Sequence, residues 1–295
     1  MNKWLKRGAV ATLALVAGAA VAFAVLVELG ERKLERKVEV AVVGVPYRDD
    51  AASVERGRYL FASRGCGDCH GMNGAGRPLI DDGAMHIRTP DITPAPQGVA
   101  ARYTPADWVR TIRHGVKPDG RPLMIMPSEE YNRFTDADLA AVVAYARRLA
   151  PGDGAKAEIR LPLPVKALYA IGVVRDASEK IDHTLAPSVP VAEGVNEAHG
   201  AYVANGCVGC HGARLAGGKI PGAPPAWPPA AKLTPGPGSA LDRYATAEQF
   251  MAMLKTGKRP DGSSVSTVMP FTALREMSEV DVRALYLHLH SLPPG

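Results

Sequence analysis

Two five-residue motifs constrain this chain more than any other feature of its sequence. They are Cys66-Gly-Asp-Cys69-His70 and Cys207-Val-Gly-Cys210-His211. Together they contain all 4 cysteines of the protein, and in each motif two thiols three positions apart are followed directly by an imidazole. This spacing is typical of covalent haem attachment, in which the thiols form thioethers to two vinyl groups and the histidine binds the iron. The sequence therefore predicts two covalently bound haem c groups.

Two other uses of paired cysteines fit the pattern poorly. A zinc site needs further cysteine or histidine ligands at fixed spacing, and these pairs lie too far apart in sequence to form one compact ribbon. A thioredoxin-like motif follows a strand in a βαβ unit, whereas here each pair follows a glycine, Gly65 or Gly206, and a short helical pattern.

An apolar segment near the N-terminus predicts export of the chain. Three basic residues precede an uncharged run from Ala9 to Val27, which as a helix would span about 28 Å, close to the hydrocarbon thickness of a bilayer. The run continues past Ala22-Phe-Ala24, which resembles a cleavage site, and this favours an uncleaved anchor over a signal peptide. Since covalent haem attachment implies export, we expect one span in the inner (cytoplasmic) membrane and haem domains in the periplasm.

The chain is long enough for two domains, and its charge excludes one class of partner. The net charge of +5 is spread over 295 residues without a strongly basic region. Haem propionates would cancel much of this charge, so we expect no binding to nucleic acid.

The sequence after the first haem motif is repeated after the second. Threonine caps at helix starts, glycines at helix ends, Met-Pro pairs and hydroxyl caps of a last helix recur in the same order. These pairs are Thr104 and Thr246, Gly115 and Gly257, Met126 and Met269, and Thr135 and Ser278. The repeat predicts two copies of one small helical domain, which needs haem to complete its core.

The predicted fold class is all-α, with two tandem domains after one transmembrane helix. The predicted boundaries are 1–30 for the membrane anchor, 31–52 for the stalk, 53–150 for the first domain, 151–196 for the connector and 197–295 for the second domain. The alternating charges of 31–37 predict a solvated helical stalk, and Ser53 is the expected cap of the next helix. The connector contains an apolar stretch, 161–174, that we expect to be buried against the two haem domains or to dock on a membrane partner.

The order of these elements resembles class I cytochrome c domains. The resemblance is carried by the C-x-x-C-H motifs, by Thr-Pro-Asp-Ile-Thr-Pro at 89–94, by the helix from Trp108 to Gly115, and by the Met-Pro pairs before the last helix. More narrowly, the chain is similar to the cytochrome c subunits of membrane-bound alcohol, aldehyde and sugar-acid dehydrogenases, although it has two haem motifs where the three-haem subunits have three.

The resemblance implies an iron ligand set and a function. It places His70 and Met126 on one iron, and His211 and Met269 on the other. Filled axial positions suit electron transfer and not substrate binding, so the chain is expected to be no enzyme. The expected partners are a dehydrogenase or quinol-oxidising complex upstream and an oxidase or soluble cytochrome downstream in a respiratory chain. The alternatives are a dihaem enzyme, such as a peroxidase or a thiosulfate-oxidising cytochrome with an open axial position, and a passive tether.

Overall fold

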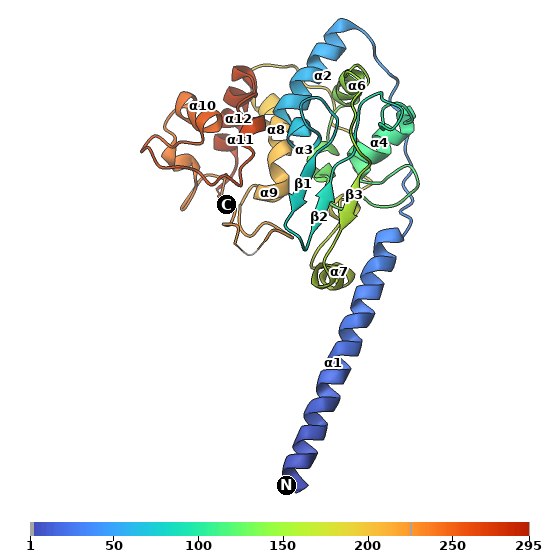
Figure 1. Cartoon of the computed structure of the whole chain (residues 1–295). Helices are drawn as coiled ribbons and strands as arrows, with labels where there is room; N and C mark the ends of the chain where they lie inside the picture. Colours follow the sequence, from blue (N-terminus) through green and yellow to red (C-terminus); the bar gives the residue numbers. More distant parts are fainter. Residues whose placement is uncertain (1–2, 225, 295) are drawn as a thin grey trace.

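A computed structural model describes residues 3–224 and 226–294 of the chain. Residues 1, 2, 225 and 295, which fall in the predicted anchor and second domain, lie outside the described residues. The described part is mostly helical, with one long N-terminal helix that projects from two helical units packed side by side (Figure 1).

The first helical unit contains α2 (Ala51–Ser63), α3 (Cys66–His70), α4 (Pro105–His114), α5 (Ser128–Tyr131) and α6 (Asp136–Ala146). The second contains α8 (Glu197–Ala204), the 3-10 turns η2 (Asn205–Cys207) and η3 (Leu241–Arg243), and α9 (Val208–His211), α10 (Ala247–Thr256), α11 (Phe271–Leu274) and α12 (Glu279–Ser291). Outside them lie α1 (Lys3–Glu35), α7 (Leu163–Ala170), η1 (Ser178–Lys180) and three short strands, β1 (Pro78–Asp81), β2 (His86–Arg88) and β3 (Glu158–Arg160).

The repeated helix signals act as the sequence predicts. Thr104 and Asp107 form a capping box at the start of α4, and the Thr246 side chain accepts from the Gln249 N–H at the start of α10. Both of these helices end at a left-handed glycine. The cap of α2 differs from the prediction: Asp50, and not Ser53, accepts the N–H bond, because the helix begins at Ala51, three residues earlier than a cap at Ser53 requires.

The first and last helices of each unit cross in direct backbone contact. α2 packs on α6, and α8 packs on α12. A Cβ at Gly57 of α2 would overlap the Ala141 carbonyl oxygen, and a Cβ at Gly200 of α8 would overlap that of Ala284. The absent side chain therefore sets the separation of each helix pair.

α1 is long and apolar enough to cross a membrane, and its C-terminal end contacts the rest of the protein. The helix ends at Glu35, within the predicted stalk, and that stalk is only partly solvated: Glu31, Arg32, Glu35 and Lys37 are exposed, whereas Lys33 and Arg36 are partly buried. Lys33 pairs with Glu179 at 2.8 Å, and Arg36 pairs with the fully buried Asp176 at 2.6 Å. The alternating charges have partners in the connector, which the local sequence pattern does not reveal.

The connector supplies β3 and α7, and its apolar stretch is only partly buried. β1, β2 and β3 form an antiparallel sheet for which the sequence analysis predicted no strands. Leu161 and Tyr169 are buried with Met124 in a small cluster, whereas Leu168 and Ile171 are exposed. The expected burial of 161–174 against both helical units is therefore wrong: the segment packs on α1 and on one side of the first unit.

A tyrosine of the first unit binds the last helix of the second. The Tyr59 hydroxyl donates to the Asp281 carboxylate at 2.6 Å and accepts the Ser278 N–H at 3.0 Å. Arg64 also pairs with Asp281 at 2.6 Å, and both of these side chains are buried. Burial alone would raise the pKa of Asp281, but Arg64 and the hydrogen bonds outweigh it and hold this pKa below its ordinary value.

A tyrosine of the second unit makes the equivalent contact with the last helix of the first unit. The Tyr202 hydroxyl donates to Asp138 at 2.6 Å and accepts the Thr135 N–H at 3.2 Å. Arg56 also pairs with Asp138 at 2.9 Å, but this ion pair lies within the first unit and does not cross the interface as the Arg64–Asp281 pair does. The two helical units therefore meet through equivalent surfaces, as the subunits of a twofold-symmetric dimer do.

Candidate haem sites

The first C-x-x-C-H motif forms the short helix α3, and the second spans the last residue of η2, Cys207, and the short helix α9. Cys66 and Cys69 lie three residues apart on α3, so both sulfurs are on one face, with His70 at the end of the helix. The residue after each histidine is a glycine with φ near +75° to +79°, at Gly71 and Gly212. A residue with a Cβ would be strained there, and this turn directs the chain away from the imidazole.

Both motif histidines are held with one ring nitrogen free. His70 Nδ1 donates to the Pro90 carbonyl oxygen at 3.1 Å, and His211 Nδ1 donates to that of Ala231 at 2.7 Å. Because a carbonyl only accepts, Nδ1 carries the proton and Nε2 keeps its lone pair. Burial lowers the pKa of both rings and so favours the neutral form that binds a metal.

The motif thiols are protonated in the absence of a covalent partner. Burial raises the pKa of Cys66 and of Cys207 to about 12. Redox-active C-x-x-C cysteines have lowered pKa values instead, so these thiols lack the electrostatics of a disulfide oxidoreductase.

The two Met-Pro methionines lie in the same cores as the motifs. Met126 and Cys66 pack on the core of the first unit, and Met269 and Cys207 pack on the core of the second. Met124 is two residues from Met126, but it is buried in the separate cluster with Leu161 and Tyr169. Among the methionines of the Leu-Met-Ile-Met-Pro segment, Met126 is the one that shares a core with a haem motif.

Buried polar atoms without partners also fit a group that the chain alone does not supply. Among the described residues, Trp108 Nε1 in the first unit and Thr234 Oγ1 in the second are buried without a hydrogen-bond partner. Both can donate to a carboxylate, such as a haem propionate. With a free imidazole nitrogen and two thiols in each motif, and a thioether packed on the same core as the first cysteine of the motif, the residues present fit one haem c per unit.

Most of the remaining histidines have other partners. His114 lies 3.0 Å from His183, measured between the Nδ1 atoms, and the buried His199 binds Asp281 at 2.7 Å. His86 lies 3.4 Å from both Asp81 and Glu158. In residues 3–224 and 226–294 no group of three histidine, cysteine, aspartate or glutamate side chains is arranged to hold a metal ion.

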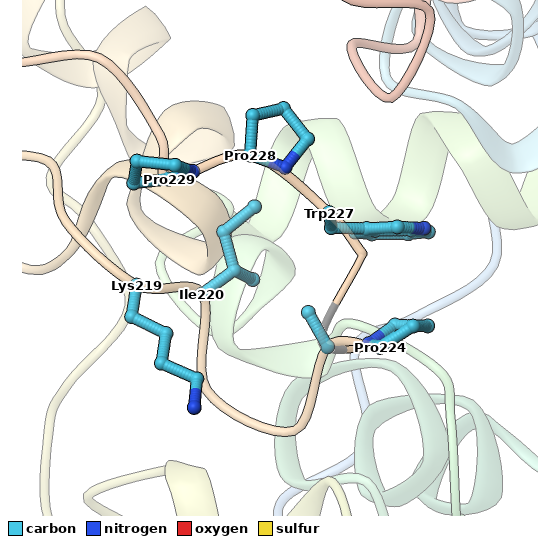
Figure 2. Close-up of a pocket in the computed structure, with 7 residues that line it drawn as sticks. Lys219, Ile220, Pro224, Trp227, Pro228 and Pro229 are labelled. Atoms are coloured by element: carbon cyan, nitrogen blue, oxygen red, sulfur yellow. The ribbon is translucent and has the colours of Figure 1, made fainter.

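A shallow pocket of about 280 Å³ lies on the proline-rich loop that follows His211 (Figure 2). Its lining is mainly apolar and includes Ile220, Pro224 and Trp227, with Lys219 at one side. Trp227 remains 44% exposed, so it is a surface residue of the loop and not part of the core around Met269.

The two candidate sites meet where the helical units touch. α3, which carries the first motif, contacts α11, which follows Met269-Pro270. α9, which carries the second motif, contacts α5, which follows Met126-Pro127. Sequence analysis predicted iron ligands in each half but not this crossed arrangement, because no local pattern records which surfaces two domains share.

Two family models match the two helical units. Residues 52–145 match the model described as cytochrome C oxidase, cbb3-type, subunit III, and residues 195–293 match the model described as cytochrome c. Each match contains one C-x-x-C-H motif and one Met-Pro pair.

Several characterised proteins are similar to the chain. The fructose dehydrogenase cytochrome subunit of Gluconobacter japonicus is 27% identical over 82% of the chain and 53% of its own length. The cytochrome c subunit of a quinone-dependent alcohol dehydrogenase from Gluconacetobacter polyoxogenes is 29% identical over 83% of the chain and 57% of its length. A diheme cytochrome c-type protein of Cereibacter sphaeroides is 25% identical over 81% of the chain and 85% of its length. The chain thus spans about half the length of the dehydrogenase subunits that it matches.

Proposed function

The two helical units of this chain are cytochrome c domains, each with one covalently bound haem c, and from this premise we propose that the chain is a membrane-anchored electron relay. Electrons enter one haem singly from a dehydrogenase or quinol-oxidising complex, pass to the other, and leave to an oxidase or a soluble cytochrome. When bound, haem iron supplies the one-electron couple, and the protein supplies the ligands, the burial and the docking.

We propose the iron ligands that the sequence repeat and the family resemblance indicate. His70 and Met126 would bind one iron, and His211 and Met269 the other. The free ring nitrogen of each histidine supports this pairing, as does the packing of each methionine on the same core as the first cysteine of a motif. A thioether ligand together with an imidazole ligand would raise the reduction potential of the bound iron and would leave it no open position. Such a site exchanges electrons without binding a substrate at iron.

The observation that best supports an electron relay is the contact between the two candidate haem sites. Each motif helix packs on the segment after the other unit's Met-Pro pair, so both haem sites lie at one interface. The reciprocal Tyr59–Asp281 and Tyr202–Asp138 bonds hold that interface in one arrangement. A fixed, close pair of sites favours electron transfer between the two haems within one chain.

The membrane location is part of the proposal. α1 supplies one helix of sufficient length, and relatives of the chain are named as subunits of quinone-dependent and sugar dehydrogenases. We infer that α1 stays attached as a single inner-membrane span with both haem domains in the periplasm, where a periplasmic or membrane-bound dehydrogenase can reach them.

The test uses the full-length chain purified in detergent. A pyridine haemochrome assay is expected to return two haems per chain, and the dithionite-reduced spectrum is expected to be unchanged by carbon monoxide. Oxidised soluble cytochrome c added to the reduced chain is expected to take up two electrons per chain. A carbon monoxide adduct in the purified wild-type chain, or turnover of hydrogen peroxide, would show an open iron site and contradict the relay in favour of a dihaem enzyme.

A further inference from the structure

α7 and the turn after it present an apolar surface to solvent. The side chains of this surface are large, uncharged and half-exposed, at 52% for Leu163, 39% for Leu168, 57% for Ile171 and 58% for Val173. The one charged residue of the stretch 161–174 is Lys166, and its ammonium group pairs with Glu31 of α1. Exposed apolar side chains grouped in one segment are typical of a contact with a partner or a membrane.

The opposite side of α7 is attached to the protein and cannot move independently. Tyr169 is fully buried, its carbonyl oxygen accepts from Lys33 Nζ at 2.9 Å, and its hydroxyl donates to Asp176 at 2.6 Å. Leu161 and Tyr169 also pack with Met124 of the first unit. The apolar surface is therefore a fixed feature of the fold and not the exposed side of a loose linker.

α7 contacts α1 just beyond the end of the apolar run of α1. Gly30 is the buried residue of α1, and a Cβ there would overlap the Lys166 carbonyl oxygen, so the two backbones touch. Gly30 lies three residues beyond Val27, the last residue of the uncharged run, which is about 4.5 Å along the helix axis. Figure 1 shows α7 beside the upper end of α1, on the side of the helical units that faces the projecting helix.

We propose that α7 and the turn through Val173 form a membrane-surface segment whose exposed apolar side chains insert between the lipid headgroups and the hydrocarbon. This inference rests on the proposed membrane anchor. The headgroup regions extend a bilayer from about 30 Å of hydrocarbon to about 40–45 Å in total, so a contact about 4.5 Å beyond the hydrocarbon lies within one of them. Helices that lie in this zone bury their apolar face at the boundary with the acyl chains.

The partner that fits this surface is lipid because of where the surface lies. The exposed side chains Leu163, Leu168, Ile171 and Val173 are uncharged, and the one cation of the stretch 161–174, Lys166, is paired with Glu31. Insertion is therefore driven by apolar contact and not by headgroup charge. With α1 and α7 both attached to the bilayer, the first helical unit is held at one distance and orientation above the membrane.

The test uses the full-length chain in lipid nanodiscs with nitroxide labels. Since haem attachment consumes all 4 native cysteines, an introduced cysteine is the one free thiol. Ile171→Cys and Leu168→Cys report on α7, Leu15→Cys reports on the anchor, and Val189→Cys, at a connector residue that is 79% exposed, reports on water. Collision with oxygen measures contact with lipid, and collision with a water-soluble nickel chelate measures contact with water.

We expect the labels at Ile171 and Leu168 to collide severalfold more with oxygen, relative to nickel, than the label at Val189. Leu168→Glu in the Ile171→Cys chain is expected to reduce that ratio, and an unchanged Soret spectrum shows that this surface variant is folded. If the α7 labels match Val189 while the Leu15 label is in lipid, the anchor stands and the α7 inference is wrong, which leaves the surface to a protein partner. If the Leu15 label is absent or in water, the proposed anchor itself fails.

Discussion

Met124 and Met126 differ in surroundings more than their separation in sequence suggests. Met126 packs with Cys66 on the core of the first unit, and Met124 is buried with Leu161 and Tyr169 beside the connector. The repeat places Met126, and not Met124, in register with Met269. Both the register and the packing support Met126 as the iron ligand.

We predict that Met126→Ala removes one of two sulfur-to-iron absorption contributions at the far-red end of the oxidised spectrum and opens that haem to carbon monoxide. The alanine has no sulfur to fill the sixth position. Met124→Ala is the matched control. It should leave the absorption intact and lower the free energy of unfolding by about 2–5 kcal/mol, as loss of a buried methionine side chain does. The reverse pattern would show that Met124 is the ligand.

His114 makes the folding stability of the first unit depend on pH in the acidic range. Its ring faces His183, whose Nε2 donates to the Ser178 carbonyl oxygen, so His183 Nδ1 accepts and His114 Nδ1 donates. Burial, followed by the charge of His183, lowers the pKa of His114 to about 4. Between this value and the unfolded pKa of about 6.5, the unfolded chain binds more protons, so stability falls as the pH is lowered through that window.

We predict that His114→Thr, which introduces the residue found at the equivalent position Thr256, flattens the loss of stability between about pH 6.5 and 4. Urea midpoints followed by circular dichroism at several pH values measure the slope. His290→Thr, at an exposed histidine of α12, is the control and should keep the wild-type slope. An unchanged slope in His114→Thr would assign the acid sensitivity to another group.

At the scale of elements, the crossing of the first and last helices determines the shape of each unit. Gly57 allows α2 to approach α6, because any Cβ there overlaps the Ala141 carbonyl oxygen. Alanine has the higher intrinsic helix propensity, by about 1 kcal/mol. The overlap involves backbone that cannot rotate away, so the steric cost exceeds this gain.

We predict that Gly57→Ala lowers the free energy of unfolding by about 1–3 kcal/mol, and that Gly200→Ala does the same in the second unit. Denaturant titration measures both. Arg58→Ala, at the next residue of α2, is the control; it removes an exposed ion pair with Glu55 and should cost less than about 1 kcal/mol. A stabilised Gly57→Ala protein would mean that α2 and α6 can separate without loss.

At the scale of the whole molecule, the two tyrosine contacts determine how the units sit together. Tyr59 and Tyr202 each accept a backbone N–H at the start of the other unit's last helix, from Ser278 and Thr135. Removing a hydroxyl leaves both the amide and a buried carboxylate with one partner fewer.

We predict that Tyr59→Phe combined with Tyr202→Phe accelerates hydrogen exchange at the amides of Thr135 and Ser278 by roughly tenfold, which corresponds to about 1.4 kcal/mol. Tyr286→Phe is the matched control, because its hydroxyl donates to the Tyr244 carbonyl oxygen within the second unit. It should leave both amides protected. Equal protection in the double variant would show that other contacts hold the interface.

The N-terminal helix gives a prediction about the mature protein. If α1 is an uncleaved anchor, intact mass measurement should find Lys3 retained and two haems added. A chain in which residues 1–30 are replaced by a cleavable signal should be a dihaem protein that no longer needs detergent. Its pairs between Arg36 and Asp176 and between Lys33 and Glu179 lie beyond the deletion and should keep the connector folded. Mature wild-type chains that begin near Val25 would refute the anchor.

The sequence by itself determined what depends on local spacing. The two C-x-x-C-H motifs, the helix caps at Thr104 and Thr135, and the repeat of Met126 in Met269 could be recognised because the residues that interact are close in sequence or recur in register. The same reasoning distinguished Met126 from Met124. Two such copies were enough to predict the mostly helical fold and two haems.

Only the tertiary structure decided which distant surfaces meet. Tyr59 and Asp281 form a hydrogen bond although they are more than two hundred residues apart in sequence, and no local period connects them. The sequence pattern of the stalk predicted solvated charges, because the residues that pair with Lys33 and Arg36 lie far away in the sequence, at Glu179 and Asp176 of the connector. Burial is a property of the folded chain. The sequence pattern alone therefore does not show which face of α7 is exposed and which is buried; the packing of α1 against the helix shows this.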